Sequence, residues 1–360
     1  MKKQKINLIK NIKYKFLFWF FKRIATPIQP IENEQKQRLL IISYDAIGDT
    51  VATAPLFHAI KKARPEWSVD FICRDRNIDI IKNHSAIDVI WNINFQAKPL
   101  SLNKQDKLAL QTLYKQKYDK VLYLGQAMKW PVFYRILKLH ANERLALPVK
   151  GLSERGIDLI GSNVFHRYIG KNRDETRQFT KRMVSILPDI GIEGSGEFNY
   201  DLNIPRKVII KQVADNSILF NPCGTQSGNT LSADKSDEII NALIEHGYQV
   251  YVFARDEVRK CLTENAISKL NFISSTSIID ACNAIMDIGL TATTDTSIGH
   301  ISSALGIKTV IIRADEAWRA DGDPLSGNAL IAAAENNGTI EDVSIDKIIN
   351  LVQLHRSKEK

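Results

Sequence analysis

The chain has 360 residues, of which 44% are hydrophobic and 25% are charged, enough for two packed cores of ordinary globular composition. This excludes a disordered, collagen-like or coiled-coil protein, and the longest apolar run, Phe16 to Phe21, is far shorter than the roughly 20 residues of a membrane-spanning helix. The four cysteines form no CxxC pair, so we expect neither a metal site nor a disulfide framework, as suits a reducing cytoplasm.

The formal charge of +9 is concentrated at the start of the chain. Residues 1–26 hold eight lysines and arginines and no acid, which leaves a net charge of only +1 on the remainder. Nucleic-acid binding requires a basic patch on the folded body, so we expect no nucleic-acid partner.

Within this tail, apolar residues between Ile6 and Ile24 recur at spacings of three and four, with lysines between them. The pattern predicts an amphipathic helix, and its aromatic and basic composition favours a membrane surface contacted through residues 1–26. A helix packed on the protein body and a cleaved secretory signal are the alternatives. Pro27 and Pro30 end the predicted helix.

In the body, continuous apolar runs predict buried parallel strands, with a helix after the first strand over about 50–63. The expected strands of the first half are 38–43, 69–73, 89–93 and 120–124. After the Gly-rich stretch 191–197 the pattern restarts, with strands at 218–221, 249–253, 287–293 and 309–312 and helices at about 233–246, 298–305 and 344–355.

This repetition predicts an α/β fold with two doubly wound halves that face one another across a cleft. We expect a basic tail and linker over 1–34, one domain over 35–200 and a second over 201–360, with the last helix packed on either domain. Ligands of open parallel sheets bind beyond the carboxyl ends of the strands, so three loops there are candidates for a site.

The first candidate loop runs from Asp45 to Thr50. Gly48 permits close backbone approach, and Asp49 is placed either to act as a general base in the cleft or to cap the following helix. No GxGxxG is present, which disfavours a dinucleotide-binding oxidoreductase.

The other two loops, 222–230 and 292–300, are rich in hydroxyls and each leads into a helix. Backbone N–H groups at a helix N-terminus suit a phosphate or diphosphate, although an ordinary surface loop has a similar composition. Asp295 and Thr296 are candidate helix caps, and His300 has either a packing or a functional role.

Together these loops resemble glycosyltransferase family 9, the ADP-heptose:lipopolysaccharide heptosyltransferases. The resemblance is carried by three segments: the opening strand with Ile47-Gly48-Asp49-Thr50, then Phe220-Asn221-Pro222-Cys223-Gly224, then Thr294-Asp295-Thr296 with His300 and Ala304-Leu305-Gly306. It implies GT-B architecture, two Rossmann-like domains with the acceptor bound by the first and a nucleotide sugar by the second, and inverting transfer without a metal or cofactor.

On this resemblance Asp49 corresponds to the proposed base, with Gly48 and Thr50 beside it in the acceptor loop. The implied donor-binding residues are Cys223, Gly224, Thr225, Ser227, Asn229, Glu257, Asp295, Thr296, Ser297 and His300. Ser297 stands where the family usually has glycine, and the lysine that commonly follows the second segment is missing. Lys235, Arg255, Arg313 and Arg319 are possible replacements, and Asp321 to Asp323 is expected to lie far from the phosphates.

The resemblance thus implies transfer of a heptose or related sugar, from a donor such as ADP-heptose, to the inner core of lipopolysaccharide. The enzyme is expected on the cytoplasmic face of the bacterial inner membrane, held there peripherally. The alternative function is a non-catalytic protein that binds nucleotide sugars, or a scaffold, with the same two-domain shell.

Overall fold

The computed structural model describes residues 36–44, 46–125, 130–147, 165–171, 175–193, 198–315 and 319–357. The basic tail lies outside the described residues, so the membrane contact through residues 1–26 stays a prediction. The domain boundary near residue 200 also stays a prediction. It falls in the segment that connects the two halves described below.

The N-terminal half is a six-stranded parallel sheet in the order β3-β2-β1-β4-β5-β6. Its strands are β1 (Arg38–Ile42), β2 (Ser68–Cys73), β3 (Val89–Asn92), β4 (Lys117–Tyr123), β5 (His140–Ala146) and β6 (Arg167–Tyr168). The helices are α2 (Ile47–Ala63), α3 (Asp75–Ile81), α4 (Lys104–Leu113), α5 (Trp130–Leu137) and α7 (Phe179–Val184).

The C-terminal half is a second parallel sheet of six strands in the order β9-β8-β7-β10-β11-β12. Its strands are β7 (Ser217–Asn221), β8 (Gln249–Phe253), β9 (Asn271–Ile273), β10 (Leu290–Thr294), β11 (Lys308–Arg313) and β12 (Ala329–Ala333). The helices are α8 (Ala233–Glu245), α9 (Asp256–Arg259), α10 (Glu264–Ile267), α11 (Ile278–Ile288), α12 (Ser297–Ala304) and α13 (Ile345–Ser357).

Both sheets therefore have the strand order 3-2-1-4-5-6 of the doubly wound nucleotide-binding fold. In this order the connections reverse direction between the first and fourth strands, which are β1 and β4 in one sheet and β7 and β10 in the other. The predicted α/β class is confirmed. The last helix, α13, packs on β11, β12 and α8 and so belongs to the C-terminal half.

Two predicted boundaries are wrong. Helix α2 begins at Ile47 rather than near Thr50, because the Asp49 carboxylate accepts the Ala46 N–H at 2.9 Å and caps an earlier turn. Strand β10 begins at Leu290 rather than at Asp287, which lies in α11 before the helix stop at Gly289, whose φ is +78°.

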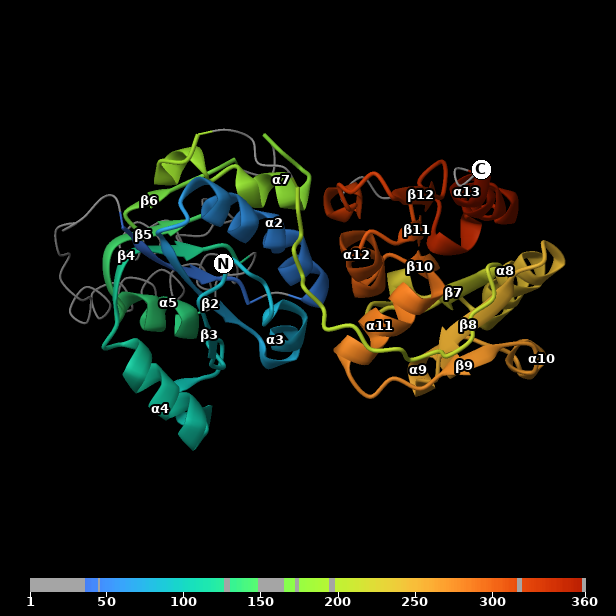
Figure 1. Cartoon of the computed structure of the whole chain (residues 1–360), viewed down its shortest axis with the longest axis horizontal. Helices are drawn as coiled ribbons and strands as arrows, with labels where there is room; N and C mark the ends of the chain where they lie inside the picture. Colours follow the sequence, from blue (N-terminus) through green and yellow to red (C-terminus); the bar gives the residue numbers. More distant parts are fainter. Residues whose placement is uncertain are drawn as a thin grey trace, which may run out of the picture.

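The two halves pack directly against one another. Helix α2 contacts α12, and α3 contacts α11, which Figure 1 shows between the sheets. One cluster of buried apolar side chains is continuous across this contact and includes Val51 of α2, Ile285 of α11 and Ile301 of α12. The carboxyl ends of the two sheets are thus held in a shared region.

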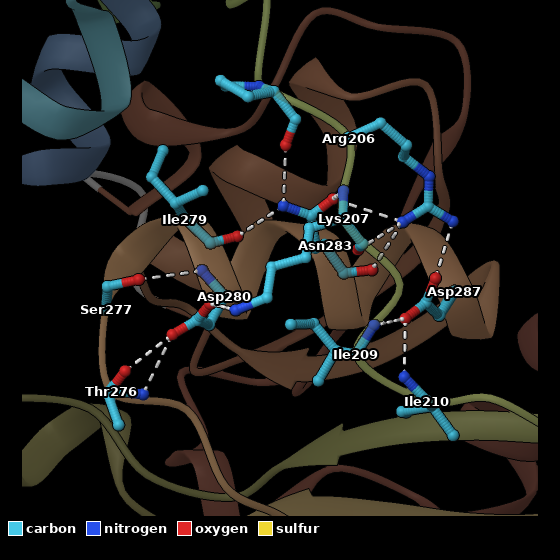
Figure 2. A network of polar contacts seen from close by, with 11 residues as sticks. Arg206, Lys207, Ile209, Ile210, Thr276, Ser277, Ile279, Asp280, Asn283 and Asp287 are labelled. Atoms are coloured by element: carbon cyan, nitrogen blue, oxygen red, sulfur yellow. Dashed lines mark hydrogen bonds and ion pairs between the residues drawn. The ribbon is translucent and has the colours of Figure 1, made fainter.

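The segment that connects the halves is fastened to α11 (Figure 2). Asn283, which is fully buried, donates to the Pro205 carbonyl at 3.0 Å and accepts the Lys207 N–H at 2.7 Å. Asp287 pairs with Arg206 at 2.6 Å and accepts the N–H groups of Ile209 and Ile210. These bonds make residues 205–210 part of the C-terminal half.

Candidate functional site

Three polar side chains meet at the point where the connections of the C-terminal sheet reverse. Asn221, the last residue of β7, donates from Nδ2 to the hydroxyls of Thr293 at 3.1 Å and Thr296 at 3.4 Å. Thr296 in turn caps α12 by accepting the Ile298 N–H. Because open α/β sheets bind ligands at this reversal point, loops 222–230 and 295–297 border the expected nucleotide position.

A second set of contacts joins the same two loops. Asn229, in the 3-10 turn η4 (Ser227–Asn229), donates to the Asp295 carbonyl at 2.5 Å. A Cβ on Gly224 would lie 3.0 Å from both the Asn229 Cβ and the Thr296 Cγ2, so only glycine fits there without displacement of a neighbour. Ser227 and Thr225 remain exposed, and Ser297 is half-buried as the first residue of α12.

Glu257 and Cys223 lie close together at this edge. Burial raises the pKa of the Cys223 thiol to about 12. The neighbouring Cys261 thiol and the Glu257 carboxylate also raise this pKa, and Arg255 lowers it. Arg255, one of the expected replacement cations, therefore lies near this loop. Lys235 instead pairs with Glu238 at 3.4 Å, within α8.

Asp49 lies in the first turn of α2, at the carboxyl end of the N-terminal sheet. It is half-buried, and its interaction with Ala46 is the capping alternative of the sequence analysis. Burial raises the pKa of its carboxyl group, against the opposing effects of the Ala46 N–H and of the side chains of His300, Arg74 and Arg182. This carboxylate therefore caps α2 and also lies near basic side chains from both halves.

His300 brings the C-terminal half to this position. A Cβ on Gly48 would lie 2.7 Å from the His300 Cδ2, so the imidazole of α12 rests on the first turn of α2, beside Asp49. Thr50, by contrast, is fully buried and its hydroxyl accepts the Asn77 amide at 2.6 Å. That hydroxyl holds α2 against α3 and does not face an acceptor.

Loops 222–230 and 295–297 are the candidate donor loops. The expectation that Asp321 to Asp323 lies far from them is wrong for Asp323. Burial raises the pKa of the Asp323 carboxyl, and among the smaller contributions are Asp295, which raises it, and His300, which lowers it. Asp323 is paired with Arg313 at 3.2 Å, so this arginine also lies near the α12 N-terminus. The intervening chain folds back because residues 319–322 form a 3-10 turn after β11.

A cleft of about 430 Å³ lies at the carboxyl ends of the first three strands of the chain, and it was not expected from the sequence. It is open to solvent and is lined by Tyr44, Arg74, Asp75, Arg76, Asn94 and Gln96. Arg74 donates to the Tyr44 carbonyl at 2.9 Å and lies over the Tyr44 ring. Arg74 and Arg76 come directly after the apolar run of β2, and this position was the sequence signal that could have identified the cleft.

Within the described residues, no three His, Cys, Asp or Glu side chains form a group able to hold a metal ion.

Comparisons with known proteins place this arrangement in a family. The family model described as "Glycosyltransferase family 9 (heptosyltransferase)" matches residues 182–342, which include both donor loops and α12. The lipopolysaccharide heptosyltransferase 3 of Escherichia coli K12 is 24% identical over 289 residues, 74% of this chain and 78% of that protein. Residues 182–342 thus match glycosyltransferase family 9.

Solved structures show the same fold across nearly the whole length of the chain. A family 9 glycosyl transferase from Veillonella parvula has a TM-score of 0.72 at 14% identity, covering 92% of this chain and all of that one. The E. coli heptosyltransferase WaaC with ADP has a TM-score of 0.70 at 14% identity, covering 88% of this chain and 99% of that one. Both agree with the GT-B architecture expected from the sequence.

Proposed function

We propose that this glycosyltransferase moves a heptose, or a related sugar, from ADP-heptose to the inner core of lipopolysaccharide. The name of its E. coli relative and the ADP that accompanies the WaaC structure support this choice of sugar, acceptor and nucleotide. The observation that carries the proposal is the placement of Asp49 beside His300, where the carboxylate of one half borders the loops of the other.

Asp49 acts as the general base in this proposal. It removes the proton from the acceptor hydroxyl as the oxygen attacks the anomeric carbon, on the face opposite the departing diphosphate, so the product has inverted configuration. A base is most effective when its pKa lies near the working pH, and burial shifts the pKa of Asp49 in that direction. The Ala46 N–H and the Arg74 guanidinium keep the carboxylate oriented and ionised.

The C-terminal half holds the donor. The diphosphate lies between loops 223–229 and 295–297, where the N-terminus of α12 and the hydroxyls of Thr225 and Ser227 receive its oxygens. Glu257 is placed to contact the nucleoside. Fixed amide dipoles and Arg255 stabilise the negative charge of the leaving group, so the proposed transfer requires no metal.

The cleft of the N-terminal half holds the acceptor. Arg74 and Arg76 suit the carboxylates and phosphates of an inner-core saccharide, because a guanidinium binds such groups through paired hydrogen bonds. Asn94 and Gln96, which line the same cleft, supply neutral hydrogen bonds. The acceptor hydroxyl then reaches Asp49 from the side of α3, and the enzyme works on the cytoplasmic face of the inner membrane.

The test is a transfer assay with purified full-length protein, a delipidated inner-core acceptor and separate nucleotide sugars. We expect product with ADP-heptose, little with ADP-glucose or UDP sugars, the same rate in EDTA, and an inverted anomeric configuration by NMR. Binding of nucleotide sugars without transfer from any of them would contradict the proposal and favour the non-catalytic alternative.

A further inference from the structure

A basic surface lies beside the acceptor cleft, on helix α4 and the 3-10 turn η1 (Pro99–Ser101) that precedes it. The sequence from Gln96 to Lys117 holds five lysines and a single acid. That acid, Asp106, is buried, and its carboxylate accepts the Asn94 N–H at 3.1 Å. All the formal charge that this segment exposes to solvent is therefore positive.

Two leucines project from the same surface. Leu100 of η1 is 99% exposed and Leu108 of α4 is 65% exposed. Helix α4 buries Asp106, Leu110 and Leu113, at spacings of four and three, so Leu108 points away from the core and lies one turn from Lys104. We refer to the outward-facing residues Lys98, Leu100, Lys104, Lys107, Leu108 and Lys115 together as the α4 face.

The lysines of the α4 face have no acidic partner in the part of the chain that the structure describes. Among the described residues, no side chain forms an ion pair with Lys98, Lys104, Lys107 or Lys115. Figure 1 shows α4 at the outer edge of the N-terminal half, away from the C-terminal half. The face is therefore not part of the contact between the halves, and its charge is available to an anionic partner.

The α4 face is rigidly connected to the cleft. The buried Arg135 of α5 donates to the carbonyls of Phe95 at 2.7 Å and Ala97 at 2.6 Å, which fixes the loop that carries Asn94 and Gln96. Leu100 follows Gln96 by four residues, a span of at most about 14 Å even in extended chain. A surface that binds the α4 face is thereby set at a fixed position relative to the cleft.

We propose that the α4 face docks on an anionic lipid bilayer and turns the acceptor cleft toward that surface, an inference that rests on the proposed lipid-anchored acceptor. The leucines enter the interface between headgroups and acyl chains while the lysines contact headgroup phosphates. Each lysine near an anionic leaflet strengthens binding by about fivefold. A second copy of the chain is a poor occupant, since a symmetric contact would bring the lysines against their own counterparts.

The first experiment reports whether this face touches lipid, whatever the tail contributes. Full-length Leu100→Trp is mixed with phosphatidylglycerol vesicles containing brominated lipid, and its fluorescence is compared with that of the parent chain. We expect the added tryptophan to shift to the blue and to be quenched. Leu354→Trp, at a 43% exposed position on α13 of the other half, is the control and should be unquenched. Equal quenching of both variants, or of neither, would overturn the proposal.

The second experiment measures partition into vesicles by flotation. Full-length Lys104→Glu/Lys107→Glu should bind anionic vesicles at least tenfold more weakly than the parent, and both should bind phosphatidylcholine weakly. Lys211→Glu/Lys269→Glu makes the same charge change at exposed positions in the C-terminal half and should bind like the parent. Loss of binding in both double variants would show a non-specific charge effect and overturn the proposal.

Activity separates this inference from the proposed function. The Lys104→Glu/Lys107→Glu variant should transfer sugar to a delipidated acceptor at the parental rate and to a vesicle-bound acceptor at least tenfold more slowly. Quenching at position 100 without any sugar transfer would refute the proposed function and keep the membrane contact. Normal transfer with no quenching, or a concentration-dependent dimer that buries Leu100, would refute the membrane contact.

Discussion

The two halves of the molecule have the same sheet topology and opposite chemistry at their carboxyl edges. The N-terminal edge presents charged groups, Asp49 and the cleft arginines Arg74 and Arg76. The C-terminal edge presents amides and hydroxyls, with Asn221 and Thr296 hydrogen-bonded across the reversal point. The shared strand order determines at which edge of each sheet a ligand binds, and the residues of the loops determine the chemical class of that ligand.

The halves also differ in how their loops are held. In the C-terminal half, the Asn229 side chain of one candidate donor loop donates to the Asp295 carbonyl of the other, and Asn221 at the end of β7 donates to Thr296. In the N-terminal half, Arg74, Arg182 and the His300 side chain of the other half lie near a carboxylate that is already engaged as a helix cap. The two candidate donor loops are thus joined to one another, whereas the environment of Asp49 depends on both halves.

Removal of the Asp49 charge gives the largest expected effect. Asp49→Asn keeps an oxygen for the Ala46 N–H, so α2 should start at the same residue while kcat falls by about 10²- to 10⁴-fold, the usual contribution of a general base. The dissociation constant for ADP, measured by calorimetry, should stay unchanged. Asp79→Asn on the exposed part of α3 is the control and should be fully active.

The same carboxylate predicts the acid side of the pH profile. Because burial raises the pKa of Asp49, the base form is lost at a higher pH than for an exposed aspartate, so kcat should fall as the pH is lowered through that raised value. A rate that rises in acid would mean that Asp49 works in its protonated form.

Acid should destabilise the N-terminal half through His84. This residue is 2% exposed, and burial lowers its pKa to about 4, so the folded protein holds the imidazole neutral while the unfolded chain protonates it near pH 6.5. Its contribution to stability is therefore present above pH 6.5 and lost as the pH falls toward 4, by about 3 kcal/mol in total. Urea unfolding of His84→Gln should show a weaker pH dependence, and His246→Gln in the other half should match the parent.

A methyl group at Gly48 should disturb the contact between the halves. Gly48→Ala places a Cβ 2.7 Å from the His300 ring, which should lower the free energy of unfolding by about 2 kcal/mol. His300→Ala in the same chain should restore most of that loss, a coupling that thermal denaturation can measure. Gly327→Ala, with nothing within 4 Å, should change stability by less than about 0.5 kcal/mol.

The smallest effect is expected in the donor half. Asn221→Leu keeps the side-chain volume but removes the amide that joins β7 to Thr293 and Thr296, so the affinity for ADP should fall about tenfold while sugar transfer at saturating donor is largely kept. Asn271→Leu on the edge strand β9 is the matched control. An equal loss of ADP affinity in both variants would show that the amide at the reversal point has no special role in binding the nucleotide.

Most of the fold follows from continuous apolar runs, which identify the buried parallel strands and therefore the loops after them. Four strands, β5, β6, β9 and β12, were not predicted, and the first two show where this signal fails. Strand β5 has Glu143 and Arg144 in its interior, and Glu143 pairs with Lys120 of the adjacent β4, so its sequence does not look like a buried strand. Strand β6 has only two residues.

The features of the candidate site also divide into those that local sequence identifies and those that it does not. Asp49 and the two donor loops were predictable because each follows a strand and matches a family segment. The contact of His300 with Gly48 was not, because it depends on how two separately folded halves are oriented. Nor did local sequence show that Asp323 lies near Asp295, since the chain must first pass through β11 and return.

The most direct test of this division between the halves is hydrogen–deuterium exchange of the full-length protein with and without ADP. Binding to the C-terminal half should slow amide exchange in residues 222–231 and 294–300 and leave residues 46–50 and 74–76 unchanged. Protection confined to the N-terminal segments would place the nucleotide beside the cleft arginines and contradict the assignment of donor and acceptor.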